Sequence, residues 1–114
     1  MQIQINTDRH VDGNETWSSE VEAELRDKLG RFAERITRIE LHLGDVNAER
    51  AGEDMRCVIE ARLASRQPTS VTEQAATAAQ AVSGAIGKMQ SALDSIFGKT
   101  LAARRVPRPG KEPL

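Results

Sequence analysis

The residue types that most often do chemistry are few in this chain. Two histidines, His10 and His42, and a single cysteine, Cys57, are present. Neither histidine stands at metal-ligand spacing from Cys57 or from a pair of acids, so a zinc-type site is not indicated. Cys57 occupies an apolar position of an alternating segment, which favours a small buried hydrophobe over a reactive thiol.

Motifs that carry enzymatic chemistry are also missing. The sequence contains no phosphate-binding loop, no Gly-x-Gly-x-x-Gly and no Gly-x-Ser-x-Gly. Acidic residues number 17, but they fall on helix and strand surfaces where solvation explains them. We therefore expect no enzymatic activity, no cofactor, no metal ion and no small-molecule substrate.

Basic side chains are the second kind of chemistry that the spacing supports. On a helical wheel Lys28, Arg31 and Arg35 fall within one narrow sector, and Arg38 continues it where the next strand begins. Such a ridge is suited to contact nucleic-acid phosphates. The alternative, which composition alone slightly favours, is a solvated helix face paired with neighbouring acids. Other basic residues extend the ridge if the two predicted helices lie side by side: Lys88, Lys99, Arg104 and Arg105.

The net charge of −1 is unevenly placed. Residues 99–114 hold five basic residues and one acid, a charge of +4, so residues 1–98 carry −5. This distribution excludes a surface that is basic throughout. Aromatic residues make up 3%, which argues against a platform that stacks unpaired bases.

Length and composition indicate one small domain that folds in a reducing compartment. The chain has 114 residues, 39% of them hydrophobic, enough for an aliphatic core. One cysteine excludes a disulfide framework and fits the cytoplasm. Residues 1–10 lack the apolar region of a secretory signal, and no run approaches the ~18 apolar residues of a membrane span.

Periodicity defines the elements that must position the basic residues. Four segments alternate apolar and polar residues and predict strands: 2–6, 38–46, 55–65 and, more weakly, 69–74. Two segments have helical periodicity. They are 17–35, with Thr16, Ser18 or Ser19 as its cap, and a long helix that follows a Thr77-x-x-Gln80 capping box and stops at Gly98.

Two features of the helices concern glycine. Gly30 lies inside the first helix and costs up to about 1 kcal/mol relative to alanine. Gly84 and Gly87 weaken the second helix, but they let it sit close to a neighbour.

The predicted order is β-α-β-β-β-α, an α+β fold. We expect one four-stranded antiparallel sheet whose apolar face packs on both helices and whose other face meets water. Hairpin-length connections make strands two, three and four antiparallel neighbours. Residues 1–98 form this domain, and 99–114 form a basic, proline-containing flexible tail.

Residues 31–43, Arg-Phe-Ala-Glu-Arg-Ile-Thr-Arg-Ile-Glu-Leu-His-Leu, resemble the helix-to-strand junction of a known family. It is the family of short ribosome hibernation-promoting factors and ribosome-associated inhibitors, and the resemblance covers about residues 2–99. These proteins share the element order and have a fold similar to double-stranded-RNA-binding domains. The resemblance implies a bacterial stress or stationary-phase protein of the cytoplasm. Such a protein binds the small ribosomal subunit in the channel shared by messenger and transfer RNA.

The resemblance also assigns residues to ribosomal RNA. It implies phosphate contacts by Arg9 after the first strand, by Lys28, Arg31 and Arg35 on the first helix, and by Lys88 and Lys99 on the second. To these the charge pattern adds Arg38, Arg104 and Arg105. Because no second domain follows in this sequence, the ribosome-pairing activity of long family members is not expected of it.

The second helix departs from the family pattern. Thr77-Ala78-Ala79 stands where the family has an acidic cap followed by Met and Tyr, and Ser91, Asp94 and Ser95 stand where it has Lys and Arg. Fewer phosphate contacts weaken affinity and its salt dependence. Either the basic tail compensates or the chain has another partner.

Three functions therefore remain open from the sequence. The first is a ribosome-associated hibernation and translation-inhibiting factor. The second is a diverged protein–protein interaction module that has lost strong RNA binding, and a weak homodimer is one form of it. The third is an enzyme or ligand-binding protein that uses the open sheet face.

Overall fold

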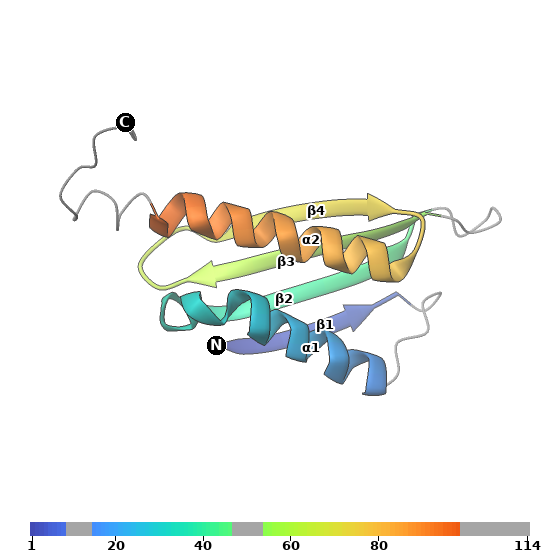
Figure 1. The fold of residues 1–114 in the computed structure, drawn as a ribbon, viewed down its shortest axis with the longest axis horizontal. Helices are drawn as coiled ribbons and strands as arrows, with labels where there is room; N and C mark the ends of the chain where they lie inside the picture. The colour runs from blue at the N-terminus through green and yellow to red at the C-terminus, as the bar shows by residue number, and fades with distance from the viewer. Residues whose placement is uncertain (9–14, 47–53, 99–114) are drawn as a thin grey trace.

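The computed structural model describes residues 1–8, 15–46 and 54–98. Within them the order is the predicted one, and Figure 1 shows how the elements are arranged. The strands are β1 (Gln2–Thr7), β2 (Ile36–Asp45), β3 (Met55–Leu63) and β4 (Thr69–Ala75). The helical elements are α1 (Glu15–Leu29), the 3-10 helix η1 (Gly30–Arg35), α2 (Ala78–Leu93) and the π-helix η2 (Asp94–Gly98).

The four strands lie in the order β1-β2-β3-β4. Strands β2, β3 and β4 are antiparallel neighbours, as predicted. The prediction of a wholly antiparallel sheet is wrong for β1, which pairs parallel to β2, with Ile3 opposite Ile39. The cause is α1: a helical crossover returns the chain to the end of the sheet at which β1 began, so β2 runs in the same direction.

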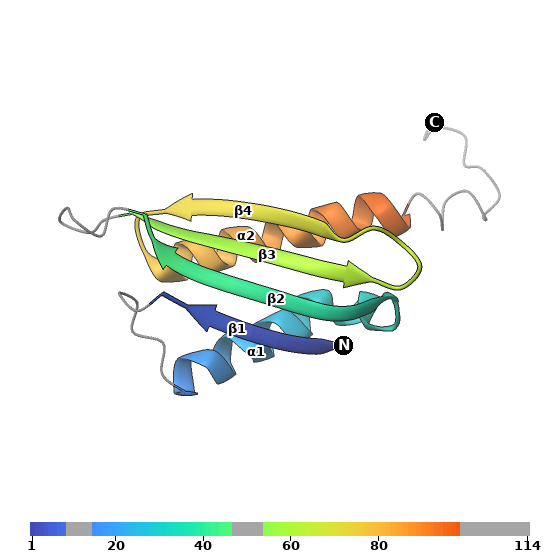
Figure 2. The ribbon, with the colours of Figure 1, turned by 180° about the vertical axis from the view of Figure 1, so that it is seen from behind.

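Both helices cover one face of the sheet, and Figure 2 shows the other face from behind with the helices beyond it. The covered face is apolar: Ile39, Leu41 and Ile59 have no exposed surface. The helices bury Leu25 and Met89 against it. We call the uncovered side the open face; the alternation of each strand places its polar residues there. This two-layer α+β arrangement confirms the predicted fold class.

The first helix is shorter than predicted. Its α-helical part ends at Leu29, and Gly30–Arg35 continues as a 3-10 helix whose tighter turn begins at the glycine. The buried face that the helical periodicity predicts continues past Gly30, because Phe32 and Ile36 are both buried. The three residues predicted as its N-cap, Thr16, Ser18 and Ser19, all lie inside the helix because α1 begins at Glu15. None of them is therefore its N-cap.

The second helix begins as predicted. Thr77 is its N-cap, and the Thr77 hydroxyl accepts a hydrogen bond from the backbone N–H of Gln80 at 3.2 Å. The prediction that two glycines let this helix sit close to a neighbour holds for one of them. A Cβ at Gly84 would lie 2.7 Å from Cγ of Glu73 on β4, whereas one at Gly87 would meet open space. Gly84 thus lets the helix lie close to a side chain of β4.

Candidate functional site

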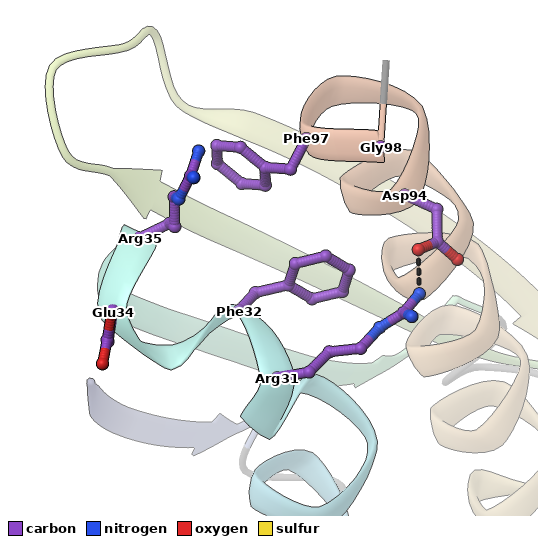
Figure 3. Close-up of a pocket in the computed structure, with 7 residues that line it drawn as sticks. All are labelled: Arg31, Phe32, Glu34, Arg35, Asp94, Phe97 and Gly98. Carbon is purple, nitrogen blue, oxygen red and sulfur yellow. Dashed lines mark hydrogen bonds and ion pairs between the residues drawn. The ribbon is translucent and has the colours of Figure 1, made fainter. Parts of the chain in front are cut away.

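A cavity of about 400 Å³ opens between the ends of the two helices, and we call it the η1–η2 cavity (Figure 3). One wall is the 3-10 helix that ends α1, and the other is the π-helix that ends α2. Both segments depart from α-helical geometry at the C-terminal end of a helix, where 3-10 turns are common. Seven residues line it: Arg31, Phe32, Glu34, Arg35, Asp94, Phe97 and Gly98.

Two buried phenylalanines form the base of the cavity. The rings of Phe32 and Phe97 have centroids 5.9 Å apart, and their residues are 7% and 3% exposed. They hold the ends of the two helices together because each ring lies on the shared apolar face. The basic residues around the cavity contact the outward faces of the two rings.

Guanidinium groups cover these rings. The guanidinium carbon of Arg31 lies 4.7 Å from the centroid of Phe32, and that of Arg35 lies 5.0 Å from the centroid of Phe97. Arg66, from the turn between β3 and β4, lies 5.4 Å from the same Phe97 ring. A cation over an aromatic face is attracted by the ring's negative quadrupole. The rings therefore favour these orientations of the three cationic side chains, by about 0.5–1 kcal/mol each at an exposed site.

Arg66 was not among the sequence-predicted residues. It stands 31 positions after Arg35 in the chain, and only the β3–β4 turn brings it to Phe97. The turn was evident from the Ser65-Arg66-Gln67-Pro68 pattern, but nothing in that pattern indicated where its side chain would lie.

The cavity also contains acidic groups. Nη2 of Arg31 donates to Oδ1 of Asp94 in an ion pair that joins η1 to η2 (Figure 3). Glu34 points away from this pair. The formal charges of the two arginines and the two acids that line the cavity cancel. The site is thus far less basic than three arginines suggest.

Lys28 lies one turn before the cavity and is exposed. Its backbone carbonyl accepts a hydrogen bond from Nε2 of Gln90 at 3.4 Å, which ties α1 to α2. Its ammonium group makes no ion pair with any of the residues that the structure describes. Of the predicted ridge, the structure therefore brings Arg31 and Arg35 to one cavity, with Lys28 close by in sequence.

Lys88 does not join this group. Its ammonium lies 2.8 Å from Oε1 of Glu73 and donates to the backbone carbonyl of Thr72 at 2.8 Å. Both partners belong to β4, the edge strand on the far side of α2 from α1. The expectation that Lys88 extends the ridge is wrong in its geometry, because the space at Gly84 lets Glu73 reach it. Lys88 instead covers part of a free sheet edge.

Arg38 lies on the open face. Its Nε is 2.7 Å from Oε2 of Glu40, and its Nη1 donates to the side chain of Gln2 at 3.4 Å. Neighbouring Ile39 points to the helices, so strand alternation sends Arg38 to the opposite side of the sheet. The prediction that Arg38 continues the helix ridge is therefore wrong.

Four further predicted residues lie outside the described part of the chain. They are Arg9, Lys99, Arg104 and Arg105, and the predicted tail 99–114 lies there too.

The cysteine and the described histidine do not form a reactive centre. Cys57 has no exposed surface, and burial raises the pKa of its thiol to about 12. His42 sits on the open face, with Nε2 2.7 Å from Oδ1 of Asp8, beside a hollow of about 310 Å³. No group of three potential metal ligands occurs among residues 1–8, 15–46 and 54–98.

Within the same ranges, none of the helices has the length and apolar character needed to cross a membrane.

Two of the solved structures that are similar to this chain illustrate the shared fold. The N-terminal domain of Thermus thermophilus Protein Y superposes with a TM-score of 0.68 at 17% identity, covering 84% of this chain and 99% of that one. A ribosomal subunit interface protein from Coxiella burnetii gives a TM-score of 0.68 at 15% identity, covering 86% and 99%. At such identities the likeness shows a shared fold. No curated protein sequence matches the chain.

The family itself is defined by sequence. Residues 3–100 match the family described as Sigma 54 modulation protein / S30EA ribosomal protein, so the match spans most of the 114 residues. This result confirms the family whose helix-to-strand junction residues 31–43 resemble. The chain belongs to the Sigma 54 modulation protein / S30EA ribosomal protein family, a non-enzymatic family of ribosome-associated proteins.

Proposed function

We propose that this protein binds the small ribosomal subunit through phosphates of ribosomal RNA. Bound there under stress, it inhibits translation and keeps the ribosome idle. The observation that carries the proposal is the cluster of guanidinium groups held over Phe32 and Phe97 at the η1–η2 cavity. The similar protein from Coxiella burnetii is a ribosomal subunit interface protein, which supports the same partner. A bacterial cytoplasm is the compartment that this role requires.

Preorganisation is the physical reason for assigning binding to this cavity. A guanidinium group has planar donors that match a phosphate in bidentate geometry. Arginine normally loses much side-chain freedom when it binds, but Arg31 and Arg35 are already held by the rings beneath them. Less entropy is lost on binding, so each phosphate contact contributes more to affinity.

Charge reversal at the η1–η2 cavity tests the proposal. We expect Arg31→Glu with Arg35→Glu to reduce co-sedimentation with small subunits by at least about tenfold at low salt, because two phosphate contacts become repulsive. The matched control is Arg56→Glu with Arg62→Glu, which makes the same charge change on the open face. That control should bind nearly as wild type does.

Two outcomes would contradict the proposal. One is the absence of wild-type co-sedimentation at both low and moderate salt. The other is equal loss in the two double variants, which would indicate only a general charge effect. Under the protein-interaction alternative, self-association measured by analytical ultracentrifugation would persist in both variants while ribosome binding is absent in all.

A further inference from the structure

We infer that Asp94 competes with RNA phosphate for Arg31 and so lowers the protein's affinity for ribosomal RNA. The inference rests on the proposed function and assigns an affinity-setting residue to the same cavity. Its basis is the ion pair that closes the cavity between η1 and η2 (Figure 3).

Asp94 occupies the donors that a phosphate would use. Nη2 of Arg31 is bound to Oδ1 of Asp94, and one face of the same guanidinium rests on Phe32. The side chains of Arg31 and Asp94 are 59% and 50% exposed, so the pair lies at the surface where RNA would approach. A phosphate that reaches this edge of Arg31 must displace one carboxylate oxygen and then lie next to it.

The place of Asp94 in its helix does not explain why the residue is acidic. It is the C-cap of α2 and the first residue of η2. A negative charge is unfavourable at a helix C-terminus, where the backbone carbonyls already concentrate negative potential. Its backbone N–H bonds to the carbonyls of Gln90 and Ser91, which residues other than proline can also do. Arg31 is the partner that its carboxylate has among the described residues.

Exchange of one anion for another has a measurable consequence. In the free protein Arg31 is already neutralised, so its contact with RNA adds little net charge compensation. Removing the carboxylate restores one full cation at the cavity. The affinity should then rise, and one more counterion should be released from RNA on binding.

The experiment compares Asp94→Asn with Glu22→Gln in binding to purified small subunits between about 50 and 200 mM salt. Glu22 is a matched control because it pairs with Arg26 on exposed α1, with side chains 43% and 51% exposed. Both changes remove one negative charge. We expect Asp94→Asn to bind roughly three- to tenfold more tightly than wild type at the lower salt, and its log–log salt slope to steepen by about 0.7–0.9. Glu22→Gln should differ from wild type by less than about twofold.

The double variant Arg31→Ala with Asp94→Asn locates the effect. If the gain acts through Arg31, the double variant should bind no more tightly than Arg31→Ala alone. A gain that persists without Arg31 would overturn the inference, as would equal affinities for Asp94→Asn and Glu22→Gln.

A loss of affinity in Asp94→Asn would also overturn the inference, because Asp94 would then hold the binding site in shape instead of competing with RNA. Thermal unfolding of each variant, with Asp94→Ala as a second substitution, checks that folding is intact. If wild type itself does not bind, the proposed function fails, whereas the other contrary results leave it standing.

Discussion

Cys57 illustrates how one residue's surroundings decide its chemistry. It lies on β3 among the buried core residues with no exposed surface. Burial raises the pKa of its thiol from 9.0 to about 12, because the thiolate would lose its hydration. At neutral pH the group is therefore a protonated, apolar side chain, as the alternation of its strand predicted.

This pKa shift predicts a pH-dependent stability. A thiol whose folded-state pKa is raised stabilises the fold fully below the unfolded-state value of 9.0, and that contribution is lost as the pH rises toward about 12. We expect Cys57→Ala to lower the free energy of unfolding by about 1 kcal/mol near neutral pH. Above pH 9 wild type should lose up to about 1.4 kcal/mol for each pH unit while Cys57→Ala does not, so the difference should vanish within about one pH unit and then reverse in sign. Urea unfolding at several pH values measures it, and a pH-independent difference would contradict it.

At the level of elements, the two glycines of α2 differ in what surrounds them. A Cβ at Gly84 would approach the Glu73 side chain to 2.7–2.8 Å, and that side chain holds Lys88. Gly87 faces open space. The same residue type therefore serves β4 packing at one position and has no packing role at the other.

Alanine at each position should separate these cases. We expect Gly87→Ala to stabilise the protein by about 0.5–1 kcal/mol through helix propensity. Gly84→Ala should show at least about 0.5 kcal/mol less benefit, because Glu73 must move and its ion pair with Lys88 is disturbed. Chemical denaturation of both variants gives the comparison. Equal stabilisation would mean that the contact between Gly84 and Glu73 is unimportant.

For the whole molecule, the charge distribution bears on the proposed RNA binding. Residues 1–98 carry −5, so under the proposed function the ribosome would meet an acidic body with a small cluster of arginines. Long-range attraction would then be weak, and binding would depend on contacts within about a Debye length of the η1–η2 cavity.

A modest salt dependence follows. Because Asp94 already neutralises Arg31, Lys28 and Arg35 supply the net phosphate contacts, and the slope of log affinity against log salt should be about −1.4 to −1.8. Titration of fluorescently labelled protein with small subunits at several salt concentrations measures it. A slope near zero would exclude phosphate contacts, and one near −6 would show that many more basic residues take part.

The sequence by itself determined the element order, the buried faces of β1, β2 and β3, the Thr77 cap and the family. These features depend on short-range periodicity and local hydrogen bonds, which neighbouring residues specify. The spacing also placed Arg31 and Arg35 close together, because both fall in one sector of the helical wheel.

Only the tertiary structure decided which charges act together. Arg66 joins Arg35 at Phe97, Asp94 neutralises Arg31, and Lys88 turns to β4. Each of these contacts joins residues that lie on different elements, and Arg31 and Asp94 are 63 positions apart. The 3-10 helix that begins at Gly30 replaces the predicted α-helical geometry, yet Arg31 and Arg35 still reach one cavity. A basic ridge is a property of sequence spacing, but the net charge available to RNA depends on which acids the fold places beside it.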